Sequence, residues 1–123
     1  MLRYVRHLAV ACALVLVSAC TTLQNPLTPT RLAAIESSYG IALSAAVGYR
    51  NACARKALPS SCRGIVAHMQ SASRVAQARV LELRAFVRNN PELDAGALIA
   101  AAQSSVQAFR DIQAVYGVGT GAQ

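Results

Sequence analysis

The chain has 123 residues, with twelve Lys and Arg against five Asp and Glu and a formal net charge of +7. This length is enough for one small domain and too short for two. Tryptophan is absent and alanine is abundant, so a core built from this sequence buries little area per residue and needs an additional source of stability.

The N-terminal segment has the layout of an export signal. Arg3 and Arg6 form a short cationic start, an apolar run extends from Leu8 to Val17, and small residues follow. That order is typical of a secretory signal peptide. The apolar run is also shorter than the roughly 20 residues that a transmembrane helix needs. We therefore expect residues 1–19 to be a cleaved signal peptide.

The end of this segment reads Val17-Ser18-Ala19-Cys20. The tetrapeptide resembles the lipobox of bacterial lipoproteins, and the resemblance covers only the first twenty residues. It implies cleavage before Cys20 and a diacylglycerol on the Cys20 thiol, with a third acyl chain in many Gram-negative bacteria. Two or more acyl chains give the stable membrane anchoring that one chain cannot. A plain secretory signal that happens to contain Cys20 is the alternative.

Thr21 follows the lipobox cysteine. By resemblance to enterobacterial lipoproteins, a residue other than Asp at this position favours the outer membrane. We therefore expect the chain to be exported and anchored at the periplasmic face of the outer membrane. Residues 20–27 are polar and broken by Pro26, which predicts a lipidated tether.

The four cysteines can be assigned once the signal is recognised. Cys12 leaves with the signal and Cys20 takes lipid, so Cys53 and Cys62 remain as an even pair in an exported chain. We expect a disulfide between them, with free thiols as the alternative. A zinc site needs more ligands than this pair and His68, and a redox pair is more typically C-x-x-C. Neither a metal nor a cofactor is expected, apart from the acyl chains on Cys20.

Three helices are expected between residues 28 and 117, at about 29–57, 62–88 and 91–116. Thr28 can cap the first and Pro29 can occupy its first position. Asn90 and Pro91 have the same roles for the third, where Glu92 and Asp94 complement the helix dipole. Apolar stripes at spacings of three and four define the core faces: Leu32, Ile35, Tyr39, Ala42, Ala46, Tyr49 and Cys53; Cys62, Ile65, Met69, Ala72, Ala76, Leu83 and Val87; Ile99, Ala102, Val106, Phe109, Ile112 and Tyr116.

No alternating strand pattern occurs, so the fold class is all-α. Short connections between long helices predict an up-down-up antiparallel three-helix bundle, followed by a flexible tail at 118–123. Cys53 ends the first stripe and Cys62 begins the second. In such a bundle the two residues face each other at the first hairpin turn, where a disulfide can form.

Charged and small residues raise further alternatives. Arg63, Arg74, Arg84 and Arg88 share one helix face, which is either a solvated side or a contact for an anionic partner. Arg79 falls on the apolar stripe, so it either snorkels, pairs with Glu82 or lies under a partner.

Small residues recur every four positions at Gly40, Ser44, Gly48 and Ala52. The uncharged window around them, residues 37–49, is too short to span a membrane. Close packing against the other helices is the preferred interpretation, and homo-oligomerisation is the alternative.

The function expected from these features is non-enzymatic. The mature chain has one histidine and scattered acids, with no paired carboxylates, nucleophile elbow or phosphate loop. We expect a lipid-anchored adaptor or accessory subunit that binds another envelope protein and, being exported, no nucleic acid. The alternatives are a phage-type envelope effector, acting in lysis or superinfection exclusion, and a binder of anionic glycolipid or wall polymer through the Arg63, Arg74, Arg84 and Arg88 face.

Overall fold

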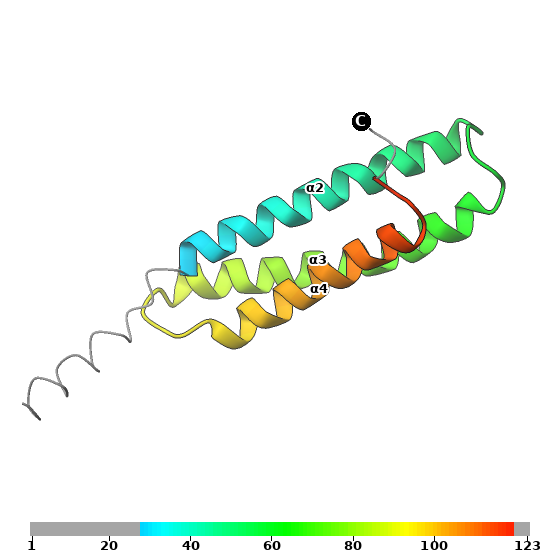
Figure 1. Cartoon of the computed structure of the whole chain (residues 1–123). Coiled ribbons are helices and arrows are strands. Elements are labelled where there is room, and N and C mark those ends of the chain that lie inside the picture. Colours follow the sequence, from blue (N-terminus) through cyan, green and yellow to red (C-terminus); the bar gives the residue numbers. More distant parts are fainter. Residues whose placement is uncertain (1–27, 120–123) are drawn as a thin grey trace, which may run out of the picture.

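The computed structural model describes residues 28–119, which form three α-helices and contain no strand. Helix α2 comprises Thr28–Ala54, α3 comprises Cys62–Asn89 and α4 comprises Gly96–Val115. Each helix packs against the other two, so this part of the chain is a helical bundle (Figure 1). The expected signal peptide (residues 1–19), the expected lipidation residue Cys20, the rest of the expected tether to residue 27 and residues 120–123 lie outside the described residues.

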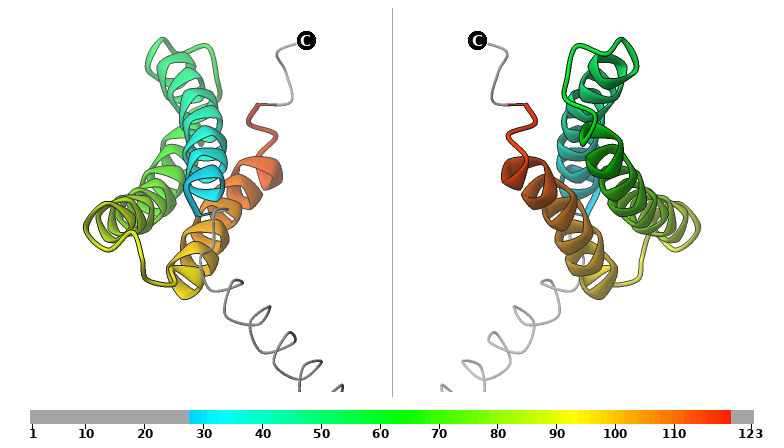
Figure 2. Two further views of the ribbon diagram at one scale, coloured as in Figure 1. Left: turned by 90° about the vertical axis from the view of Figure 1, so that its left-hand side faces the viewer. Right: turned by 90° about the vertical axis from the view of Figure 1, so that its right-hand side faces the viewer.

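The two connections lie at opposite ends of the bundle. The loop from α2 to α3 is at one end and the loop from α3 to α4 is at the other (Figure 1). Helix α4 has 20 residues against 28 in α3, and it ends before the α2–α3 loop is reached. The end-on views show that the helix axes are inclined to one another (Figure 2). The α2–α3 end of the bundle therefore contains two helices instead of three.

The core is formed by the stripes expected from the sequence. Phe109, Met69 and Leu83 are the largest fully buried side chains. The ring of Tyr39 lies 6.2 Å from that of Phe109, which joins α2 to α4. Most other stripe residues are buried or packed against this cluster: Leu32, Ile35, Ala42, Ala46, Tyr49, Ile65, Ala72, Ala76, Val87, Ile99, Ala102, Val106 and Ile112.

Helix α2 ends three residues earlier than expected. The backbone N–H of Lys56 donates to the Cys53 carbonyl over 3.1 Å, and that of Ala57 donates to the Ala52 carbonyl over 3.0 Å. Lys56 has a φ of 60°. This pair of hydrogen bonds around a left-handed residue is a Schellman motif, which terminates a helix. Lysine occupies the position where glycine is usual.

The expected start of the third helix is wrong by five residues. Asn90 completes α3 instead of capping α4, because its Nδ2 and its backbone N–H both donate to the Phe86 carbonyl, over 3.2 and 2.8 Å. Helix α4 begins at Gly96, whose N–H donates to the Asp94 carboxylate over 2.9 Å. Ala95, between them, is buried in the core. Asp94 therefore acts at the helix start from outside the helix, and Pro91 and Glu92 belong to the connection.

The residues after α4 are packed, which corrects the expectation of a flexible tail from residue 118. Gly117, with a φ of 65°, donates to the Ala114 carbonyl, and the Val118 N–H donates to the Gln113 carbonyl over 2.8 Å. This second Schellman motif turns the chain toward α2 (Figure 1). Val118 is consequently 7% exposed, and it joins the core cluster.

Candidate binding surface

Cys53 and Cys62 are joined by a disulfide at the open end of the bundle. Their Cα atoms are 5.9 Å apart, which is within the usual range for this bond. Cys53 lies in the last turn of α2 and Cys62 is the first residue of α3. The bond lies at the turn where the sequence predicts it. It holds together the two helix ends that α4 does not reach.

Contacts between α2 and α3 pair their residues in reverse order along the chain. After the disulfide, the hydroxyl of Tyr39 lies 3.2 Å from Oγ of Ser73, and the Arg84 Nε donates to Glu36 Oε1 over 2.6 Å. These contacts fix the register of the two helices. The face of α2 between Tyr39 and Cys53 is therefore opposite the first three turns of α3.

A groove runs between α2 and α3 in this segment and has a volume of about 240 Å³. We call it the α2–α3 groove. Its apolar lining includes Leu43 and Val47 of α2, each 37% exposed, and Val66 of α3. The polar side chains of Gln70 and Ser73 also line it. Arg50 on α2 and Arg74 on α3 also line it. No acidic residue of the chain does.

The two arginines lie at opposite ends of the α2–α3 groove. Because the helices pair in reverse order, Arg50 is toward the disulfide and Arg74 is toward the Tyr39–Ser73 contact. Tyr39, which lies opposite Ser73, is eleven positions from Arg50, a rise of about 16 Å along α2. Among the described residues, neither arginine side chain forms an ion pair or hydrogen bond. The groove is thus an apolar trough with a free cation near each end.

The outer side of α2 between residues 37 and 49 is uncharged and consists mostly of small residues. No residue from 37 to 49 is charged, yet five of them form an exposed strip on one helix face: Ser37, Gly40, Ile41, Ser44 and Gly48. We call this strip the α2 face. Ile41 at its centre is 71% exposed. A helix whose outer side faces only water normally carries charged residues there.

The interpretation that the small residues of α2 pack closely against the other helices is wrong for Gly40 and Gly48. A Cβ atom added at Gly40 or Gly48 would meet nothing within 4 Å. These glycines therefore do not serve close packing against α3 or α4. A three-helix bundle covers only two sides of each helix, and the small residues of α2 point to the third.

The four arginines expected to share a face do not act as one set. Arg84 forms the interhelical ion pair with Glu36. Arg74 lines the α2–α3 groove, whereas Arg63 and Arg88 are exposed at opposite ends of α3. The sequence did not indicate Arg50 as the partner of Arg74 in the groove. The Cys53–Cys62 pairing could have indicated that both arginines line one groove, because it places the last turns of α2 opposite the first turns of α3.

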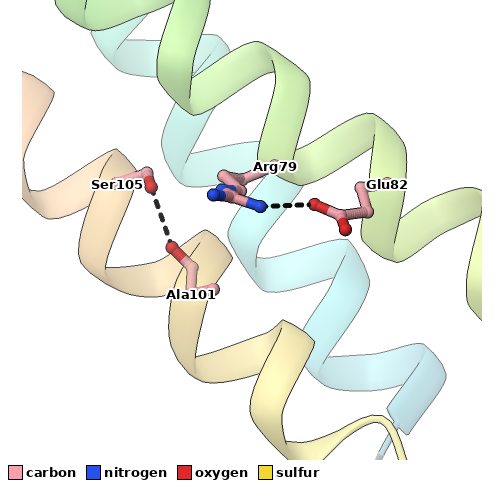
Figure 3. Close-up of polar contacts among 4 residues, drawn as sticks. All are labelled: Arg79, Glu82, Ala101 and Ser105. Carbon is pink, nitrogen blue, oxygen red and sulfur yellow. Dashed lines mark hydrogen bonds and ion pairs between the residues drawn. The ribbon is translucent and has the colours of Figure 1, made fainter.

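Arg79 does not lie on the core face of α3. It is exposed and forms an ion pair of 2.8 Å with Glu82, while Ser105 on α4 donates to its own helix at Ala101 (Figure 3). Val80 takes the core position, at 4% exposure. Pairing with Glu82, one of the three expected arrangements, is the one present.

The apolar stripe of α4 also needs correction at its end. Tyr116 is 38% exposed and its hydroxyl lies 3.5 Å from Nδ1 of His68, which is exposed too. Gln113 is buried in its place, and its Nε2 donates to the Ala42 carbonyl of α2 over 2.6 Å. The spacing of three and four from Val106 and Phe109 leads to Gln113, but its polar side chain excluded it from an apolar stripe.

The described residues give no support for a metal site or for a membrane-spanning helix. Within residues 28–119, no three His, Cys, Asp or Glu side chains gather to hold a metal ion. None of the three described helices is long and apolar enough to cross a bilayer. No protein-family model matches the chain, and no curated protein and no solved structure was found to match it.

Proposed function

We propose that the chain is an exported, lipid-anchored adaptor that binds another envelope protein through the α2 face and the adjoining α2–α3 groove. The observation that carries this proposal is the uncharged, exposed side of α2, with Ile41 71% exposed at its centre. Ile41 adjoins Leu43 and Val47 of the groove, each 37% exposed, and an exposed apolar patch on a small domain marks a contact for a protein or a membrane.

In this proposal the three helices form an up-down-up antiparallel bundle attached through Cys20 and the tether to the periplasmic face of the outer membrane. The opposite positions of the two loops and the reverse pairing of α2 with α3 support the bundle topology. The lipobox-like Val17-Ser18-Ala19-Cys20 supports the anchor. The phage-type effector stays a prediction, since no structural feature favours it over an adaptor.

The experiment is photo-crosslinking in living cells from a single introduced photoreactive residue. At Ile41 we expect one defined crosslinked product, because the α2 face contacts a partner there. Gln77, an exposed residue of α3, is the matched control and should give no such product. A product of twice the mass of the chain would indicate self-association. Equal, diffuse labelling from Ile41 and Gln77 would contradict the adaptor proposal.

The anchor is tested separately with Cys20→Ser. We expect loss of metabolic acyl labelling and release of the protein from the membrane fraction, because the acyl chains supply the attachment. Cys53→Ser is the matched cysteine control and should keep both the label and the membrane location. If Cys20→Ser retains acyl label, the lipobox interpretation is wrong.

A further inference from the structure

We propose that the α2–α3 groove binds an amphipathic helix of a partner protein, with acidic residues about three helical turns apart on either side of an apolar stretch. This inference rests on the proposed adaptor function and specifies the chemistry of the partner. An amphipathic helix laid into an apolar groove is a common mode of peptide recognition.

The lining of the α2–α3 groove offers apolar side chains to a partner helix. Leu43 and Val47 follow one another at a spacing of four on α2, and Val66 lies across from them on α3. Met69 closes the base of the groove and is 2% exposed. A third helix packing between α2 and α3 would meet a row of side chains on each side, as helices do in bundles. Helix α4 occupies the equivalent position on the other side of the α2–α3 pair.

The charge of the groove selects the acidic partner. Arg50 and Arg74 have no partner among the described residues, and the five acidic residues of the chain all lie elsewhere. Glu36 and Glu82 are paired with other arginines, and Asp94 accepts the hydrogen bond that starts α4. The groove therefore offers two cations to a partner and repels a second basic surface, including another copy of this chain's arginine-bearing faces.

The position of the two arginines distinguishes a helix from a single lipid. A lipid with one anionic headgroup places its charge at one end and a methyl group at the other, which would leave one arginine beside hydrocarbon. A helix with acidic residues about eleven positions apart spans about 16 Å between charges and reaches both arginines. The apolar residues between them fall on the same helix face. The observations favour the helix.

The test uses the full chain in neutral detergent micelles and two fluorescent helical peptides that differ only in charge. One carries two Glu residues about eleven positions apart with Leu between them on the same face, and the other carries Lys in place of Glu. Anisotropy should show the Glu peptide binding and weakening with added salt, and the Lys peptide not binding. Failure of the Glu peptide to bind, or equal binding of both peptides, would overturn the inference.

Charge reversal in the protein sharpens the result. Arg50→Glu with Arg74→Glu should raise the dissociation constant of the Glu peptide about ten-fold or more and allow the Lys peptide to bind. Arg31→Glu with Arg88→Glu makes the same change in net charge at exposed positions outside the groove. This control pair should leave the Glu peptide's dissociation constant within about two-fold of wild type. Equal effects of the two double variants would show that only net charge matters.

A lipid occupant is the remaining outcome. Phosphatidylglycerol added to the micelles should not displace the Glu peptide more than phosphatidylcholine does. Selective displacement would assign the groove to an anionic lipid and overturn the inference. Crosslinking from Ile41 separates this failure from that of the adaptor function. A defined crosslinked protein together with indifferent peptides would leave the adaptor standing without the acidic helix.

Discussion

Gln113 on α4 donates a hydrogen bond from Nε2 to the backbone carbonyl of Ala42 on α2, over 2.6 Å in the buried interior of the bundle. The contact joins the last full turn of α4 to the middle of α2. Ala42 lies between Ile41, which belongs to the α2 face, and Leu43, which lines the α2–α3 groove. The hydrogen bond therefore holds the inner side of the helix whose outer side is proposed to bind.

Gln113→Ala should lower the free energy of unfolding by about 1–3 kcal/mol. The loss combines one buried hydrogen bond, worth about 1 kcal/mol, with the space left by the missing side chain. Urea unfolding followed by circular dichroism measures it. Gln103→Ala, at an exposed position of the same helix, should change stability by no more than about 0.5 kcal/mol. Equal effects of the two substitutions would deny Gln113 this role.

The disulfide should stabilise the bundle at the end that α4 does not cover. Cys53 and Cys62 are nine positions apart, so the chain-entropy model gives a contribution of about 2–3 kcal/mol. Unfolding in urea with and without reductant should differ by that amount. The double variant Cys53→Ser with Cys62→Ser should have the lower stability and no response to reductant. If reductant does not change the unfolding of the wild-type protein, the disulfide does not have this stabilising role.

Lys56→Gly should raise the free energy of unfolding by about 0.5–1 kcal/mol. Lys56 has a φ of 60°, which costs about 1 kcal/mol for a residue with a Cβ and little for glycine. Lys56→Ala is the control, because it removes the same charge and keeps the same backbone cost. If the two variants have equal stability, the charge of Lys56 and not its backbone determines the effect.

Gly48→Ala should also stabilise the chain, by about 0.5–1 kcal/mol. Glycine inside a helix is unfavourable by that amount, and an added Cβ at this position meets nothing within 4 Å. Gly119→Ala should destabilise instead, since Gly119 has a φ of 91° that side chains rarely adopt. Thermal unfolding of the two variants gives the comparison. A loss of stability in Gly48→Ala would mean that the α2 face packs against something within the chain.

The helices and most of the core follow from sequence periodicity, because stripes at spacings of three and four are a direct signature of a buried helix face. The wrong helix boundary arises where a residue can serve either the end of one helix or the start of the next. Asn90-Pro91 reads as a helix start, but the hydrogen bonds of Asn90 to Phe86 complete α3 instead. Val80 was missed because residues 79 and 80 both fit a spacing of three or four after Ala76, and Gln113 was missed because its polar residue type outweighed its register.

The candidate surface was less accessible to sequence reasoning. The uncharged window of α2 was visible, but recognising it as an exposed face required knowing that α3 and α4 cover only two sides of the helix. The α2–α3 groove is lined by two arginines that are 24 positions apart in the chain and come to the same groove only through the reverse pairing of two helices. Such a relationship needs the register, which the Tyr39–Ser73 contact supplies.

The most direct test of the account is photo-crosslinking in cells from Val47, inside the α2–α3 groove, in three backgrounds: wild type, Arg50→Glu with Arg74→Glu, and Arg31→Glu with Arg88→Glu. The account predicts one crosslinked partner in wild type and in the control pair, and its loss in the groove pair. The partner's crosslinked segment, located by mass spectrometry, should be a helix with acidic residues on both sides of an apolar stretch. A partner captured equally in all three backgrounds, or none captured in any, would contradict it.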